Sequence, residues 1–121
     1  WKLTTVYSIS EAKWDTRELL VQTNRPTALI CGNDILATGA MYCARATGLN
    51  VPYDISIVGI GDFKGSADIE PGLTTVRLPA KRIGREAGEA LAKAIIEQTP
   101  LIGYSRHCEP KLIVRCSTTT A

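Results

Sequence analysis

A short segment, Gly32-Asn33-Asp34, follows directly on the apolar run 28–31 and precedes a stretch with helical periodicity. In an open α/β sheet, ligands bind at such a junction, beyond the carboxyl end of a strand. The Asn33 amide both donates and accepts hydrogen bonds, so it can meet a polar ligand there. The alternative is structural, because an oxygen of Asn33 or Asp34 can cap the free N–H groups of the first helical turn. The residues alone leave both interpretations open.

No catalytic motif is recognisable in the sequence. The single histidine, His107, lies in no known catalytic signature, and neither a Gly-x-Ser-x-Gly elbow nor a Walker loop is present. No Cys-x-x-Cys pair occurs, and zinc-type spacing is absent around the histidine and the four cysteines, Cys31, Cys43, Cys108 and Cys116. We therefore expect no enzyme activity, no metal and no cofactor. We expect reduced thiols, two or three of them buried, with a disulfide as the alternative.

A glycine-rich segment, Gly59-Ile-Gly-Asp-Phe-Lys-Gly65, superficially resembles a dinucleotide-binding loop. The Rossmann fingerprint needs Gly-x-Gly-x-x-Gly opening a helix directly. Here the third glycine comes one residue late and a proline-containing loop follows, so we favour a loop with close-packing glycines. A basic cluster is typical of a solvated helix face, with an anion site as the alternative; it comprises Arg77, Lys81, Arg82 and Arg85.

The composition fits an ordinary globular domain or a piece of a larger one. The chain has 121 residues, of which 45% are hydrophobic and 21% charged. A net charge of +2 is too small to indicate nucleic acid or an anionic membrane as a partner. No apolar run approaches a membrane span and no signal peptide is visible, so we expect a cytoplasmic protein with no membrane partner.

Alternating strand and helix patterns predict a parallel α/β sheet. The run 28–31 is short and uniformly apolar, which is typical of a parallel strand covered on both faces. A helix to about residue 47 follows, and Gly48 can end it with a positive φ. Helices are also predicted at 10–22 and 80–97, and strands at 55–60, 73–76 and 111–115. The resulting strand-helix-strand unit should cross over with right-handed sense.

Four motifs resemble those of LacI/GalR-type transcriptional regulators. Residues 26–41, Pro-Thr-Ala-Leu-Ile-Cys-Gly-Asn-Asp-Ile-Leu-Ala-Thr-Gly-Ala-Met, match the family's P-T-A-(apolar)-x-x-N-D-x-x-A-x-G signature. Residues 52–62 resemble its P-x-D-(I/V)-S-V-V-G-(F/Y)-D-D segment, and residues 71–76 resemble its P-P-L-T-T-(I/V) segment. Residues 112–118 are similar to its closing L-(I/V)-V-R-x-S-T. The order and spacing agree from about Tyr7 to Thr118.

The resemblance implies a fold like the type I periplasmic sugar-binding proteins, with a small molecule held between two doubly wound α/β subdomains. It implies a repressor in which effector binding changes the affinity of a helix-turn-helix headpiece for operator DNA. Residues 1–121 then represent the C-terminal part of the effector-binding domain. Within it, 7–77 and 104–118 belong to the C-terminal subdomain, and the helix at 79–98 packs on an N-terminal subdomain absent from this sequence.

The resemblance also implies which residues bind the effector. Tyr7 falls where the family often has an aromatic that stacks on the effector, and Asn33 falls on its effector-contacting asparagine. Gly61 and Asp62 fall on the family's Asp-Asp pair, and Leu78, with Ala80, lies where some members contact effector from the crossover. With Asn33 assigned to the effector, Asp34 is left mainly to cap the helix. Because Gly61 replaces a carboxylate, we expect open space and a sugar acid such as gluconate, or another anion.

Two consequences concern partners. The apolar stripe of the 80–97 helix lacks its usual cover, so we expect a homodimer, a swap or other contacts to bury it. Operator DNA is reached only through the absent headpiece, and the fragment alone should bind its effector weakly or not at all. The alternative functions are a solute-binding protein of a sugar transporter and, on the glycine loop alone, a nucleotide-dependent enzyme.

Overall fold

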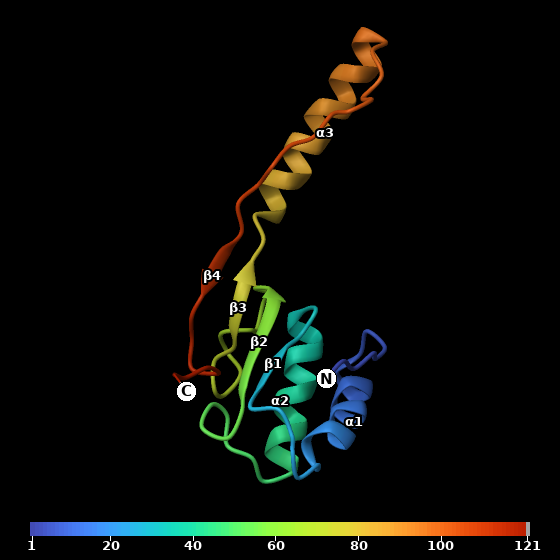
Figure 1. The fold of residues 1–121 in the computed structure, drawn as a ribbon. Helices are drawn as coiled ribbons and strands as arrows, with labels where there is room; N and C mark the ends of the chain where they lie inside the picture. Colours follow the sequence, from blue (N-terminus) through green and yellow to red (C-terminus); the bar gives the residue numbers. More distant parts are fainter. Residues whose placement is uncertain (121) are drawn as a thin grey trace. The chain divides into compact units, whose positions relative to one another are not determined.

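The computed structural model describes residues 1–120, and two compact units are found in it (Figure 1). The first unit combines residues 1–77 with the C-terminal segment from Leu112, and the second contains residues 78–111. Residues 104–111, which the sequence interpretation groups with the C-terminal subdomain, share the second unit with the long helix.

Apart from Lys111, the first residue of β4, the first unit contains one four-stranded sheet in the order β1-β2-β3-β4. Its strands are β1 (Ala28–Ile30), β2 (Ser56–Gly61), β3 (Thr74–Arg77) and β4 (Lys111–Ile113). β1 pairs in parallel with β2, and β2 pairs in parallel with β3. The predicted α/β fold with a parallel sheet is therefore present, and the carboxyl ends of three strands meet at one edge.

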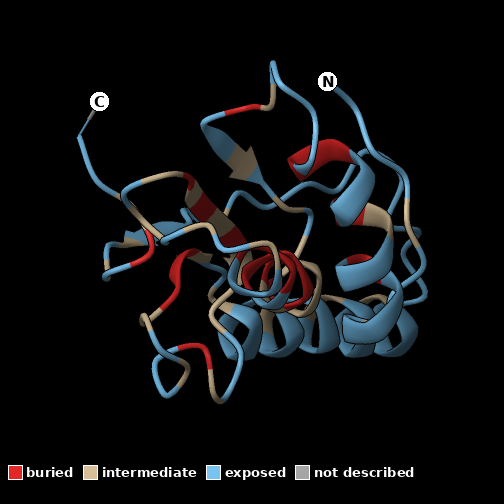
Figure 2. Ribbon diagram, turned by 90° about the horizontal axis from the view of Figure 1, so that it is seen from below, coloured by how far each residue is buried: buried red, intermediate tan, exposed pale blue. Residues whose placement is uncertain are grey.

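Helix α2 (Asp34–Ala46) packs against β2, and helix α1 (Ile9–Leu20) packs against α2. The two helices approach closely at Gly39, where a side chain would meet the Cβ of Ala12 at 2.6 Å. As predicted, Gly48 follows α2 with a φ of +80°. Figure 2 shows the buried residues gathered where α2 meets the strands. The core lies there, and its members include Ala37, Ala40, Cys43, Ile55, Ile57 and Leu73.

The prediction that the first strand is covered on both faces is wrong. Leu29 packs against the core, but Ile30 is 83% exposed. The reason is that β1 is an outer strand of the described sheet, and α2 covers only the face that carries Leu29. A cavity of about 420 Å³ adjoins β1 and is lined partly by α1 and by residues near Trp1.

The C-terminal segment is joined to the sheet by its backbone and hydroxyl groups. The Ser117 hydroxyl donates to the carbonyl of Ile57 at 2.6 Å and accepts from the N–H of Thr74 at 2.8 Å. Ser117 is fully buried, so both bonds are shielded from water. The predicted strand is shorter than expected and ends at Ile113, because the N–H of Arg115 bonds to the side-chain hydroxyl of Thr74 in β3 and not to a backbone carbonyl of that strand.

The second unit is built around α3 (Ala80–Glu97), whose bounds are those predicted. No residue of this helix is buried. Its large apolar side chains are exposed, from 43% for Ile83 to 80% for Ile96. Gln98 ends the helix in the left-handed conformation, with a φ of 52°. None of the described helices is long and apolar enough to cross a membrane.

Candidate functional site

The carboxyl ends of the parallel strands bring three sequence segments to one edge of the first unit (Figure 1). Asn33 follows β1, residues 61–63 end and follow β2, and Arg77 ends β3. The register places Gly61 opposite Arg77. Edges of this kind are where open α/β sheets bind ligands. The structure therefore brings together the candidates Asn33, Gly61 and Asp62.

Asn33 is the N-cap of α2. Its backbone is extended, and its side-chain Oδ1 accepts a hydrogen bond from the N–H of Leu36 at 3.0 Å. The prediction that Asp34 mainly caps this helix is therefore wrong, because Asn33 does so. An asparagine that caps through its oxygen still has two N–H donors on Nδ2, so capping and ligand binding are compatible in this one side chain.

Asp34 instead forms a buried hub that joins α2 to β2 and β3. Its side chain accepts three hydrogen bonds, and the residue is only 2% exposed. Oδ2 accepts from the N–H of Phe63 at 2.8 Å and from the hydroxyl of Ser66, and Oδ1 accepts from the hydroxyl of Thr75. A buried carboxylate needs such compensation, because an unpaired one is strongly unfavourable. The hub fixes the start of the loop after β2.

Asp62 is held by two arginines. Its Oδ1 lies 2.6 Å from Nη2 of Arg115, and its Oδ2 lies 2.5 Å from Nε of Arg77. The hydrogen bond from Arg115 contributes most to lowering the pKa of Asp62; burial opposes this, and the bond from Arg77 adds to the lowering. Both carboxylate oxygens are thus engaged, and the two guanidinium groups leave one positive charge in excess. An effector that bonds to Asp62 has to compete with these ion pairs.

Gly61 and Phe63 are packed against each other. Gly61 has a φ of +132°, a conformation that glycine favours, and a Cβ there would collide with the Phe63 ring. The expectation that replacing a carboxylate at this position opens space is therefore wrong, because the Phe63 ring fills it. Glycine still removes the negative charge of a carboxylate at this position, so the preference for an anionic effector stays a prediction.

The roles of Tyr7 and Leu78 in the candidate site stay predictions. Tyr7 precedes α1 and is 65% exposed, and no hydrogen bond in residues 1–120 joins its side chain to Asn33 or to the 61–63 segment. Leu78 is 44% exposed and belongs to the second unit. Sequence reasoning missed Phe63 and Arg115 as parts of this edge, and it placed Arg77 in a basic cluster with an anion site only as the alternative. The proximity of Phe63 to Gly61 in the sequence could have indicated Phe63.

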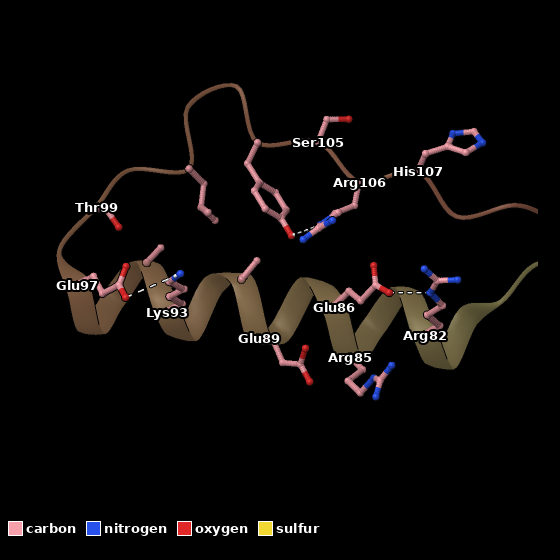
Figure 3. A pocket seen from close by; sticks show the side chains of 14 residues that line it. Arg82, Arg85, Glu86, Glu89, Lys93, Glu97, Thr99, Ser105, Arg106 and His107 are labelled. Atoms are coloured by element: carbon pink, nitrogen blue, oxygen red, sulfur yellow. Dashed lines mark hydrogen bonds and ion pairs between the residues drawn. The ribbon is translucent and has the colours of Figure 1, made fainter.

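A larger cavity, of about 810 Å³, lies within the second unit between α3 and residues 99–107 (Figure 3). Charged side chains line it, but many of them are paired with one another. Arg82 bonds to Glu86 at 2.6 Å, and Lys93 lies 3.9 Å from Glu97. Opposite charges four residues apart on an exposed helix are typical of a solvated face, as predicted for Arg82.

The thiols are all free, but fewer are buried than predicted. Cys43 is buried, Cys31 and Cys108 are partly exposed, and Cys116 is exposed. Burial, with a smaller effect of the Asp34 charge, raises the pKa of Cys31 to about 11. A thiol with such a pKa is almost fully protonated at neutral pH and is a poor nucleophile. No group of three or more potential metal ligands occurs among the described residues.

A family model and curated relatives both match most of this chain. Residues 3–118 match the model of the periplasmic binding protein-like domain. The HTH-type transcriptional repressor PurR of Serratia proteamaculans is 40% identical over 103 residues, which cover 83% of this chain and 29% of the relative. The chain thus spans less than a third of the length of that curated relative.

Solved structures agree in fold. A LacI family transcriptional regulator from Bifidobacterium animalis subsp. lactis is 30% identical, with a TM-score of 0.86 over 97% of this chain and 42% of that one. A LacI family regulator from Enterococcus faecium, solved with bound ribose, is 26% identical, with a TM-score of 0.79 over 96% of this chain and 42% of that one. Both likenesses include nearly all of the described sheet and helices.

Proposed function

Because the chain belongs to the periplasmic binding protein-like domain family of the LacI-type transcriptional regulators, we propose that it is the effector-sensing part of a transcriptional repressor. The observation that supports this most is the edge where Asn33 follows β1 beside residues 61–63. It offers a polar amide and a rigid backbone at the point where open α/β sheets bind small molecules.

The effector in this proposal is a small sugar or sugar acid. The ribose bound to the Enterococcus faecium relative supports a sugar. The excess positive charge of Arg77 and Arg115 over Asp62 supports an acidic one, because it favours an anion near the strand ends. Binding on one edge leaves the opposite side of the ligand uncovered, so a second wall completes the site, and its closure shifts the population of DNA-binding states.

The Asn33 amide gives the sharpest test. Asn33→Asp keeps a good capping oxygen but removes the two N–H donors, and Asn33→Ser keeps a capping oxygen but replaces those donors with one O–H on a shorter side chain. Ribose, D-glucose and D-gluconate are titrated into the full-length polypeptide by calorimetry and thermal shift. We expect both variants to keep the wild-type melting temperature within about 2 °C and to lose affinity about tenfold, as one lost polar contact implies. Unchanged affinity in Asn33→Asp would contradict the assignment.

The regulatory part of the proposal predicts that the ligand changes DNA binding. We expect the full-length polypeptide to bind DNA from its own promoter region and the bound ligand to alter that affinity by about 5–150-fold. The second candidate, a solute-binding protein of a sugar transporter, has the same ligand edge but no DNA affinity. Sugar binding without any DNA binding would favour that candidate, with its site outside the cytoplasm.

The homodimer is also part of this proposal. The exposed side chains of Leu91, Ile95 and Ile96 support it, since apolar residues spaced along one helix are usually covered in the working assembly. Sedimentation velocity on the wild type and on Ile95→Lys tests it. We expect a concentration-dependent dimer that the charged variant weakens. A monomer at all concentrations, with α3 exposed, would exclude the dimer.

A further inference from the structure

Phe63 combines three features that no other aromatic residue at the strand ends shows. It is 40% exposed, it lies two residues beyond Gly61 at the end of β2, and its backbone is anchored. The anchor is the bond from its N–H to the carboxylate of Asp34, which is itself fixed by two hydroxyl groups. A buried network therefore fixes the backbone from which the ring projects.

The position of the ring follows from the two glycines of β2. A Cβ at Gly59 would collide with Asp34, and one at Gly61 would collide with the Phe63 ring. Because residues two apart on a strand point to the same face, the ring lies on the face that carries the start of α2. Asn33 caps that start. The aromatic ring and the Asn33 amide therefore belong to the same corner of the edge.

We propose that Phe63 determines effector specificity by stacking on a flat apolar face of a ring-shaped effector. This inference rests on the proposed function, which places the effector at this edge. A pyranose presents C–H groups on one face, and a heteroaromatic base presents a π face, so both supply the shared chemistry that an aromatic side chain recognises. An open-chain polyol has no such face and is disfavoured.

The packing of the ring on Gly61 sharpens the specificity. A polar side chain at position 61 would need the space that the ring occupies, so an acidic or hydroxyl-bonding group and the ring exclude each other. This corner therefore offers an aromatic surface and the Asn33 amide, while the carboxylate of Asp62 is bound by Arg77 and Arg115. Ring shape, more than the number of hydroxyl groups, is the property that the corner can distinguish.

Two sugar acids of equal charge can show whether the site prefers a ring-shaped ligand to an open-chain one. D-glucuronate is a pyranose with a carboxylate, whereas D-gluconate is an open chain with a carboxylate. Both are titrated into the full-length polypeptide by calorimetry, with adenine as the heteroaromatic arm. We expect wild type to bind a ring-shaped probe, glucuronate or adenine, at least tenfold more tightly than gluconate. Whichever ring-shaped probe binds identifies the source of the flat face.

Variants at Phe63 test the stacking itself. Phe63→Leu keeps an apolar side chain but removes the flat ring, and we expect about a tenfold loss for the ring-shaped probe with no change for gluconate. Phe63→Trp retains a flat ring and should retain the preference. Tyr53→Leu is the matched control, because Tyr53 is an aromatic that is 84% exposed in a distant turn. Melting temperatures of all variants show that each is folded.

The outcomes distinguish the two proposals. If gluconate binds as tightly as glucuronate and Phe63→Leu weakens neither, the inference about Phe63 is overturned while the proposed effector function stands. If neither these three probes nor ribose and D-glucose bind wild type, both are overturned. Adenine binding that depends on Phe63 supports the inference and overturns the sugar part of the proposed function.

Discussion

Helices α2 and α3 have similarly regular apolar patterns but opposite surroundings. In α2, seven residues are buried, among them Ala37 and Ala44 at 0% exposure. In α3, which is longer, none is buried. Both helices begin close to where the sequence predicts them. The difference shows that an apolar stripe specifies where a helix forms and which face is to be covered, but that a partner surface decides whether it is.

The same contrast holds for polar groups. In the first unit, Asp34, Ser117 and Thr75 are buried and their hydrogen bonds connect segments that are far apart in the sequence. In the second unit, the ion pairs Arg82–Glu86 and Lys93–Glu97 are local and largely solvated. Local exposed pairs contribute little to stability, whereas breaking a buried network is strongly destabilising. Substitutions in the first unit should therefore have much larger effects.

The largest effect is expected at Asp34. Asp34→Ala leaves the hydroxyls of Ser66 and Thr75 and the N–H of Phe63 without their acceptor in a buried place. We expect a loss of about 3–5 kcal/mol in the free energy of unfolding, measured by urea denaturation. Glu89→Ala, on the exposed helix α3, is the control and should change it by less than about 0.5 kcal/mol. Equal effects would remove the distinction between the two units.

The next largest effect is expected for Gly→Ala, which should destabilise α2 but stabilise α3. Gly39→Ala inserts a methyl group against Ala12 and the Ile9 carbonyl, so we expect a loss of about 1–3 kcal/mol. Gly88 has no neighbour within 4 Å, and Gly88→Ala should stabilise α3 by about 0.5–1 kcal/mol. Amide hydrogen exchange, which reports each helix separately, measures both. Destabilisation by both substitutions would show that the Gly88 face is covered.

The ion pairs of the two units should differ in their dependence on pH. Because its arginine partners lower the pKa of Asp62 in the folded state, the resulting stability is complete above the unfolded pKa of about 3.9 and is lost as pH falls through the folded pKa. Asp62→Asn should lower stability at pH 7 by about 1–2 kcal/mol and flatten the acid side of the stability curve.

Glu86 provides the matched test, since Arg82 likewise lowers its pKa but the pair is exposed. We expect Glu86→Gln to leave the pH profile of urea unfolding nearly unchanged, particularly at 0.5 M salt, which screens exposed pairs. A profile that flattens equally in both variants would show that exposure does not separate the two ion pairs.

A feature of the fold could be predicted from the sequence when it depends on residues close together in the chain. The bounds of α3 and the end of α2 at Gly48 follow from periodicity and from glycine, both of which act within a few residues. The exposure of Ile30 does not, because it depends on which strand lies beside β1. The apolar run 28–31 is compatible with a covered strand and with an outer strand, so it cannot show that no strand or helix covers Ile30.

The candidate site divides in the same way. The location of Asn33 at a strand-to-helix junction is local and was predictable. That Asn33 caps α2 while Asp34 forms a buried hub could not be predicted. The partners of Asp34 lie 29 to 41 residues away, at Phe63, Ser66 and Thr75. Likewise, nothing in the sequence places Arg115 on Asp62, since the two lie 53 positions apart and only folding brings them together.

The smallest expected effect tests what covers α3. Ile57 is fully buried, so Ile57→Val should cost about 0.5–1.5 kcal/mol, whereas Ile95 is 69% exposed, so Ile95→Val should cost almost nothing in dilute solution. Hydrogen exchange at increasing protein concentration extends the comparison. If a second copy covers α3, the cost of Ile95→Val rises with concentration while that of Ile57→Val stays constant, because only the former reports an intermolecular contact. A cost at Ile95 that equals that at Ile57 at every concentration would mean that α3 is already packed within its own chain.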